Sequence, residues 1–174
     1  MKKNQGFALL MAVIVTGTLL LIVYALSNIS LKELILTHAG RESQIAFYAA
    51  DTGVECAMFW DLKNPGGGGV SAFDPFNGSS VIECNGNTIQ AGVGTVPTVP
   101  TASNSLVGGG GAGNPTSTFY INLEPNVPSQ AGACAIVRVG KHQIGNIVRT
   151  IILSRGYNTC DLDNARRLER GLLS

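Results

Sequence analysis

The chain has 174 residues, of which 45% are hydrophobic and only 6% aromatic, and its formal net charge is +1. This length is enough for one modest hydrophobic core. The nearly balanced charge excludes a global field that would draw the protein to nucleic acid or to an anionic surface. Much of the apolar content lies in the first 60 residues, whereas the middle of the chain is rich in glycine, threonine, serine and proline.

The first feature is an apolar segment over residues 7–26, which contains no charge and follows Lys2 and Lys3. A helix of this length spans about 30 Å, the thickness of the hydrocarbon core of a bilayer. The lysines predict a cytoplasmic N-terminus and export of everything after residue 30. A cleaved secretory signal is the alternative. Ala25-Leu26-Ser27 is an acceptable cleavage site, but the apolar run exceeds the usual core of about 7–15 residues.

The helical pattern continues beyond the apolar run. One stripe at helical spacing consists of Leu34, His38, Ile45, Ala49, Thr52, Cys56 and Phe59, and a second consists of Leu36, Phe47, Val54 and Met58. Asn64-Pro65-Gly66 is a stop signal, so the sequence predicts one helix over residues 7–63, about 85 Å long. One apolar face is expected to pack on the protein's own sheet. The other face needs lipid or a similar helix to cover it.

Residues 64–174 are predicted to form a globular, β-rich domain. Asn85-Gly86 between two short apolar runs predicts a hairpin. Residues 92–117 are expected to form a long surface loop. Further strands are expected at "TFYINLE", at "ACAIVRV" and "NIVRTIILSR", which "GKHQIGN" joins, and at "ARRLERGLL", where a short helix is the alternative. A long helix followed by an antiparallel meander predicts an α+β fold.

Four cysteines follow this export-like segment, namely Cys56, Cys84, Cys134 and Cys160. An even number of cysteines in an oxidising compartment favours disulfides, whereas metal binding needs closer pairs such as C-x-x-C. We therefore expect at least one disulfide. Three pairings are possible, and the sequence does not choose among them. A bond from Cys56 would tie the helix to the sheet.

We predict no catalytic residue, no metal site and no cofactor. His38 is expected on an apolar helix face and His142 in a turn, and no acid, base and nucleophile converge around them. The glycine-rich residues 108–117 lack the lysine of a phosphate-binding loop, and "CDLDN" at 160–164 lacks the rest of a calcium loop. Both are interpreted as loops. The arginines near the C-terminus, Arg166, Arg167 and Arg170, are interpreted as a solvated strand face, so nucleic acid is not expected as a partner.

The N-terminal third of the chain resembles a known family. "KKNQG" followed by the apolar run resembles the leader and first helix of type IV pilins and type II secretion pseudopilins, and "AFYAADTGVECAMFWDL" at 46–62 resembles a segment of PilX-like and K-type minor pilins. The resemblance implies a leader peptide at 1–6, which prepilin peptidase removes between Gly6 and Phe7, and methylation of the new N-terminus. It also implies a membrane and filament-core half of the helix at 7–28 and an amphipathic half at 29–63.

One departure from the family pattern bears on the role of the subunit. Major subunits of the family usually carry a glutamate at the fifth position after the cut, where this chain has Met11. In the family this acid offsets a neighbour's N-terminal ammonium in an apolar filament core, where an unpaired charge is costly. Its absence favours a minor, tip or initiating subunit over a major one.

The resemblance also implies where the protein works and with what. The expected location is the inner membrane, crossed once, and afterwards an extracellular filament. The expected partners are other pilin-like subunits, prepilin peptidase, an inner-membrane assembly platform, and membrane lipid before assembly. A secretion pseudopilin, a secreted or membrane-anchored binding domain and an exported enzyme are the alternatives, although no sequence feature favours an enzyme.

Overall fold

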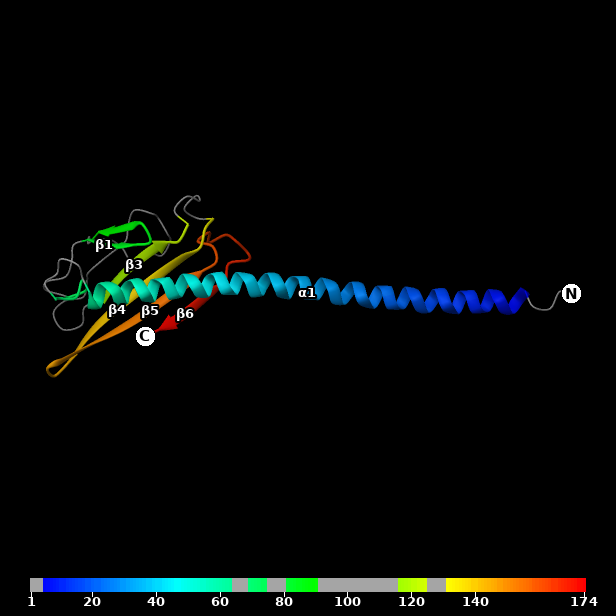
Figure 1. The fold of residues 1–174 in the computed structure, drawn as a ribbon, viewed down its shortest axis with the longest axis horizontal. Helices are drawn as coiled ribbons and strands as arrows, with labels where there is room; N and C mark the ends of the chain where they lie inside the picture. The colour runs from blue at the N-terminus through cyan, green and yellow to red at the C-terminus, as the bar shows by residue number, and fades with distance from the viewer. Residues whose placement is uncertain (1–4, 64–68, 75–80, 91–115, 125–130) are drawn as a thin grey trace. The chain divides into compact units, whose positions relative to one another are not determined.

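A computed structural model describes residues 5–63, 69–74, 81–90, 116–124 and 131–174 of the chain. A single long helix, α1 (Gln5–Leu62), precedes six strands in these residues (Figure 1). The strands are β1 (Val81–Cys84), β2 (Asn87–Gln90), β3 (Thr116–Asn122), β4 (Cys134–Ile144), β5 (Ile147–Tyr157) and β6 (Glu169–Leu173). The chain divides into two compact units, residues 1–41 and residues 42–174.

The strands of the second unit form two antiparallel sheets. One is the β1–β2 hairpin, and the other has the order β3-β4-β5-β6, so each strand lies beside the next in sequence. Asn85 and Gly86 connect β1 to β2 with φ angles of 49° and 72°. A two-residue hairpin turn with both φ angles positive favours Asn-Gly, which is why this turn is predictable. The predicted α+β class is confirmed.

The hairpin between β4 and β5 is longer than predicted. The sequence pattern predicts a connection over residues 140–146, but strand pairing continues to Ile144↔Ile147 and only Gly145 and Asn146 form the turn. Gly145 has a φ of 62°, a conformation that glycine adopts without strain. The prediction was wrong because this part of the hairpin is exposed on both faces. It therefore lacks the alternation of apolar and polar residues that marks a half-buried strand.

The core lies between the four-stranded sheet and residues 42–62 of α1, which Figure 1 shows across one face of that sheet. The sheet contributes large side chains, whereas the helix contributes mainly alanine. The fully buried residues include Phe119, Ile121, Val137 and Val139 from the sheet, Ile82 and Ile89 from the β1–β2 hairpin, and Ala46, Ala49, Ala50 and Ala57 from the helix. A smaller cluster of Tyr120, Cys134, Tyr157 and Cys160 lies outside this core.

The helix face that packs on the sheet differs from the predicted stripes. Of their members, Ala49 and Val54 are buried, but Phe47, Met58 and Phe59 remain 45%, 41% and 49% exposed. The sheet instead meets a row of alanines and Gly53. Periodicity assigns large apolar side chains to the core because they gain most from burial. Here the backbones of the helix and the sheet lie so close together that large side chains do not fit between them.

Two glycines show how close the helix and the sheet are. A Cβ atom on Gly53 would lie 2.7 Å from Val137 Cγ2 and would meet Ser154 Oγ. A Cβ atom on Gly156 in β5 would meet the backbone of Ala46 and Ala50 and lie 2.9 Å from the carbonyl carbon of Ala49. Only small side chains fit between the two layers, so the large apolar side chains of this helix segment face away from the sheet.

Candidate functional site

The candidate processing junction lies in the first turn of α1. Gly6 and Phe7 follow Gln5, where the helix begins, and the side chain of Phe7 is exposed. Lys2 and Lys3, which predict the orientation of the segment, lie outside the described residues. Gly6 and Phe7 therefore both lie in the helix in this structure. Cleavage between them and methylation of Phe7, which the resemblance implies, remain predictions.

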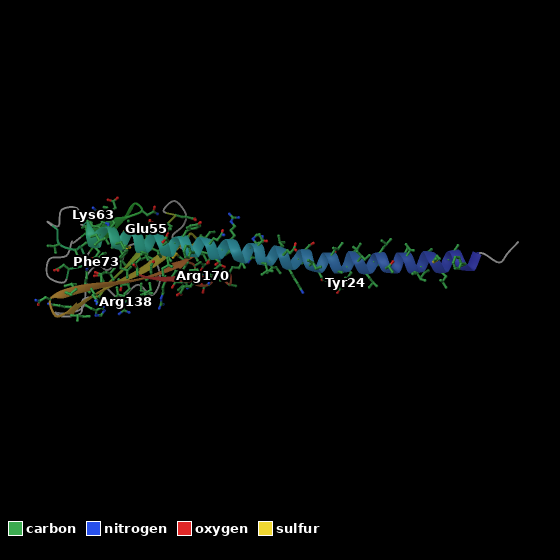
Figure 2. All side chains as sticks on the ribbon, turned by 60° about the horizontal axis from the view of Figure 1, so that its bottom comes forward. Tyr24, Glu55, Lys63, Phe73, Arg138 and Arg170 are labelled. Carbon is green, nitrogen blue, oxygen red and sulfur yellow. A yellow bond between two sulfur atoms is a disulfide. The ribbon has the colours of Figure 1, made fainter. Side chains whose placement is uncertain are left out.

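The segment that follows the junction is apolar on every side. All its large apolar side chains from Phe7 to Leu36 are exposed, and Figure 2 shows side chains, including that of Tyr24, extending outward around the helix. Met11, which stands at the position of the family glutamate, is among them. By length and composition α1 can cross a membrane, and it is the one such helix in the part of the chain that the structure describes.

Three hydroxyl groups within this segment donate hydrogen bonds to the helix backbone. Thr16 Oγ1 donates to Ala12 O at 2.8 Å, Thr18 Oγ1 donates to Val15 O at 2.9 Å, and Ser27 Oγ donates to Val23 O at 2.9 Å. A polar group in hydrocarbon must find its partner within the protein. These bonds, which were not among the predictions from sequence, make the segment suitable for an apolar environment.

A second exposed apolar surface lies on residues 42–62 of α1, on the side away from the sheet. We call it the outward helix face, and it consists of Phe47, Tyr48, Met58, Phe59 and Leu62. Aromatic rings meet edge to face at Phe47–Tyr48 and at Phe59–Trp60, with centroids 6.1 and 5.8 Å apart. Several large apolar side chains exposed on one face of a helix commonly mark an interaction surface.

The four predicted disulfide cysteines form two bonds. Cys56 pairs with Cys84 and Cys134 with Cys160, each with Cα atoms 5.9 Å apart, and no cysteine is free. The first bond joins α1 to the two-stranded sheet that β1 and β2 form. Trp60 Nε1 donates to Glu83 O at 2.9 Å and reinforces the same junction. The second bond joins β4 to the loop that precedes β6.

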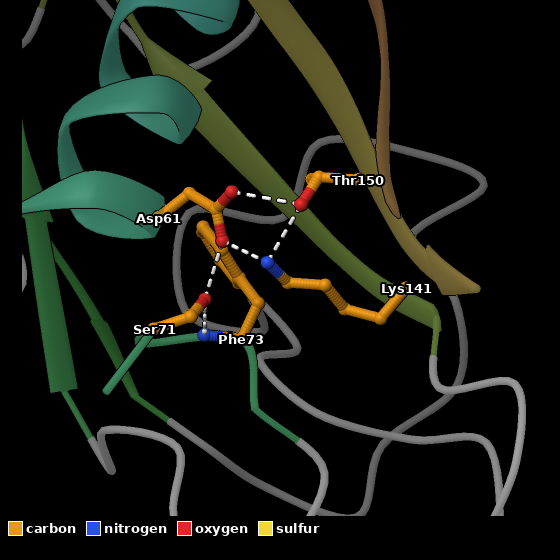
Figure 3. Close-up of polar contacts among 5 residues, drawn as sticks. All are labelled: Asp61, Ser71, Phe73, Lys141 and Thr150. Atoms are coloured by element: carbon orange, nitrogen blue, oxygen red, sulfur yellow. Dashed lines mark hydrogen bonds and ion pairs between the residues drawn. The ribbon is translucent and has the colours of Figure 1, made fainter. Parts of the chain in front are cut away.

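A buried polar cluster lies at the end of α1 (Figure 3). The carboxylate of Asp61 forms an ion pair with Lys141 Nζ in β4, and both side chains are about nine-tenths buried. Ser71 Oγ donates to Asp61 Oδ1 at 2.5 Å, and Thr150 Oγ1 in β5 donates to Asp61 Oδ2 at 2.9 Å. Lys141 Nζ also donates to Thr150 Oγ1 at 2.7 Å. The cluster fixes the last turn of the helix to two strands.

The charge state of this cluster follows from opposing effects. Burial alone would raise the pKa of Asp61, but hydrogen bonds from Lys141, Ser71 and Thr150 and the charge of Lys141 together lower that pKa below its ordinary value of 3.8. Asp61 is therefore ionised at neutral pH and stabilises the folded state. This pair was not predicted from the sequence, because 80 residues separate its members.

The candidate residues for other chemistry do not come together in the structure. His38 is exposed on α1, whereas His142 lies in β4 and not in the turn predicted for it. Among the described residues no group of three or more histidine, cysteine or acidic side chains is placed to hold a metal ion. Residues 108–115 of the glycine-rich stretch lie outside the described residues, and Ser117 is buried in β3.

The loop at 160–164 uses its polar side chains to form turns. Asp161 Oδ1 accepts a hydrogen bond from Asp163 N at 3.0 Å, and Asn164 Oδ1 accepts one from Arg166 N at 2.9 Å. These local bonds are typical of turns that contain aspartate and asparagine. The loop therefore has an internal structural role in the described conformation.

Two of the three C-terminal arginines contact other parts of their unit. The guanidinium of Arg167 lies 4.0 Å from the centroid of the Tyr157 ring, a cation–π contact. Arg170 Nε donates to Ser43 Oγ on α1 at 2.9 Å. Two of the three predicted surface arginines thus hold the C-terminal segment to the rest of its unit.

Comparison of the chain with protein-family models, with curated proteins and with solved structures found no match.

Proposed function

We propose that this chain is a structural subunit of a type IV pilus-like filament and that it is a minor, tip or initiating subunit. Prepilin peptidase cuts between Gly6 and Phe7. The N-terminal part of α1 holds the subunit in the cytoplasmic membrane, with its N-terminus on the cytoplasmic side. The assembly platform then moves the subunit out of the membrane, and its helix exchanges contacts with lipid for contacts with other pilin-like helices.

One observation carries this proposal: α1 exposes more apolar surface than a membrane anchor needs. About 20 residues are enough to cross a bilayer, but the exposed apolar side chains continue to Leu36 and reappear as the outward helix face at 47–62. A simple anchor leaves this additional surface in water. Packing against other helices would bury it, and each large apolar side chain fully buried gains about 1.5–3 kcal/mol.

Met11 supports a minor role within such a filament. From Phe7 to Leu31 the chain carries no acidic residue that could offset the N-terminal ammonium of a neighbouring subunit. Placing that ammonium unpaired among apolar helices would be costly. A subunit at the tip or at the point of initiation avoids this requirement, because it need not accept a neighbour's N-terminus.

Determining the N-terminus of the membrane-bound and extracellular forms tests the proposal. We expect both to start at methylated Phe7. A start near Asn28 would instead indicate ordinary secretion, and an intact Met1 would indicate a simple anchor. Gly6→Val is expected to leave the leader attached. The control Gly17→Val adds the same side chain at a position where nothing lies within 4 Å of an added Cβ atom, and it should be cut normally.

A further inference from the structure

The β4–β5 hairpin extends beyond the sheet that carries it. Among the described residues, the pairing of β3 with β4 ends at Thr116↔Gly140, and Ser174 pairs with β5 at Ile152. Within the part of the chain that the structure describes, residues 141–151 pair only within the β4–β5 hairpin, and Figure 1 shows this two-stranded projection beyond the end of α1. The Asp61–Lys141 contact anchors the base of this projection to the last turn of the helix.

Each face of the projection's tip carries at least one exposed apolar side chain. Ile144, Ile147 and Val148 are 61%, 65% and 60% exposed. Ile144 and Ile147 are cross-strand partners on one face, whereas Val148 pairs with Gln143 on the other. A flat protein surface would cover only one of these faces. A medium that surrounds the tip, such as the outer part of a lipid layer, would cover both.

The hairpin that carries this tip has only basic charges. Residues 134–157 contain four arginines and lysines and no aspartate or glutamate. Lys141 is paired with Asp61, and Arg155 lies 3.6 Å from Glu169. Arg138 and Arg149 form no ion pair with any side chain that the structure describes. Arg149 directly follows Val148, so a positive charge stands just behind the apolar tip.

We propose that this tip binds the surface of an anionic lipid bilayer. Ile144, Ile147 and Val148 enter the boundary between head groups and acyl chains, and Arg149 meets lipid phosphates. Two rows of strand residues measure about 7 Å, which matches the depth of about 5–10 Å reached by interfacial segments. Pairing between Ile144 and Ile147 satisfies part of the backbone at that depth.

Nucleic acid and a second copy of the chain fit the tip less well. Single-stranded nucleic acid binds to basic grooves through aromatic side chains that stack on its bases, and residues 141–151 contain no aromatic ring other than His142. A second copy would bring an equally basic hairpin to this one if the tips met. The tip belongs to the globular unit, so the proposed binding holds whether or not the chain assembles into a filament.

The test holds the full chain in nanodiscs of phosphatidylcholine and measures its sedimentation with separate, sucrose-loaded vesicles. We expect binding to vesicles that contain equal amounts of phosphatidylcholine and phosphatidylglycerol, and much weaker binding to phosphatidylcholine alone. The triple variant Ile144→Ser/Ile147→Ser/Val148→Ser should lower the partition coefficient by about tenfold or more. The control Leu162→Ser/Leu173→Ser changes two exposed apolar residues elsewhere in the same unit and should bind normally.

A pair of arginine variants tests the orientation of the tip. Arg149→Gln should weaken binding by about fivefold, since each basic residue near an anionic leaflet contributes about that factor. Arg138 lies six residues behind Ile144, about 20 Å along the strand. This distance exceeds the Debye length, so Arg138→Gln should have little effect on vesicle binding. If the triple variant fails to form its two disulfides, the comparison of Arg149→Gln with Arg138→Gln tests the proposal without it.

Equal binding to both kinds of vesicle would overturn the proposal, and so would a triple variant that binds vesicles as well as the wild type. Equal losses of vesicle binding in the two arginine variants would also overturn it. So would a triple variant that loses only self-association between nanodiscs and still binds vesicles. Binding of single-stranded DNA that displaces the vesicles and depends on both arginines but not on the isoleucines would also overturn it. The expected results with both kinds of vesicle, with the triple variant and its control, and with the two arginine variants together support a lipid-binding tip.

Discussion

Residues 7–36 and residues 42–62 of α1 differ in which apolar side chains they expose. Residues 7–36 expose every large apolar side chain, whereas residues 42–62 bury alanines and Gly53 against a sheet and turn Phe47, Met58 and Phe59 outward. The difference teaches that side-chain size, more than hydrophobicity, separates the helix surface that packs on the sheet from the surface that stays exposed.

The largest expected effect comes from closing the narrow gap between helix and sheet. Gly156→Ala places a Cβ atom against the backbone of Ala46 and Ala50, and backbone atoms cannot move aside as a flexible side chain can. We expect a loss of about 4 kcal/mol or more in the free energy of unfolding, measured by urea titration of the full chain in detergent with Trp60 fluorescence.

Gly17→Ala is the control for this variant, because nothing lies within 4 Å of its Cβ position. It should leave the unfolding of residues 42–174 unchanged. Equal stability of Gly156→Ala and the wild type would show that the helix does not approach the sheet as closely as described, and the comparison between the two helix parts would then lose its physical basis.

Removing the bond between α1 and the β1–β2 hairpin should cost slightly less. The double substitution Cys56→Ala/Cys84→Ala opens a link that spans 28 residues, for which chain entropy predicts a loss of about 3.5 kcal/mol. Intact mass without reductant should show two fewer disulfide-bonded cysteines and no new thiol. An unchanged urea midpoint would mean that the other contacts of the hairpin suffice to hold it.

The Asp61 cluster should be the next most sensitive. Asp61→Asn leaves the buried ammonium of Lys141 without its counter-charge, which is expected to lower the unfolding free energy by about 3 kcal/mol. Arg155→Gln, which breaks an exposed ion pair with Glu169, should cost less than about 1 kcal/mol. Similar losses in the two variants would contradict the burial described for the Asp61 pair.

The same cluster predicts a dependence of stability on pH. The pKa of Asp61 is lower in the folded state than its ordinary value of 3.8, so the unfolded chain takes up the proton first as the pH falls. This contribution to stability is complete above pH 3.8 and is lost as the pH drops through the lowered pKa. Urea titrations across this range should show a weaker acid dependence in Asp61→Asn than in the wild type.

The smallest effect on stability is expected at the outward helix face. Phe47→Ser/Met58→Ser should change the unfolding free energy of the globular unit by no more than about 1 kcal/mol, since both side chains are already exposed. Under the proposed function it should nevertheless reduce the amount of subunit recovered in extracellular filaments. Normal recovery, measured by blotting of sheared filaments, would show that this face does not contribute to assembly.

Much of the fold could be predicted because its signals are local. The uncharged run at 7–26, the stop at Asn64-Pro65-Gly66 and the Asn85-Gly86 turn each act over a few neighbouring residues. The cysteines could be identified as disulfide partners from their number and context, but their pairing depends on the fold. The exposed extension of the β4–β5 hairpin escaped prediction because it lacks a buried face.

The face of α1 that meets the sheet could not be predicted from periodicity. Apolar stripes mark which side chains gain from burial, but the approach of two backbones is set by Gly53 and Gly156, which lie more than 100 residues apart in the sequence. The Asp61–Lys141 pair could not be predicted either, since neither residue is distinctive in its local sequence. Both features arise only when β4 and β5 come beside residues 46–61 of the helix.

The central claim is that the apolar helix is retained and becomes covered by other helices. A photoreactive amino acid in place of Tyr24, an exposed residue of the apolar segment, tests it most directly. We predict cross-links to lipid in the membrane fraction and to the N-terminal helix of another subunit in the extracellular fraction. An extracellular form that lacks residues 7–28 and stays a soluble monomer would contradict this claim.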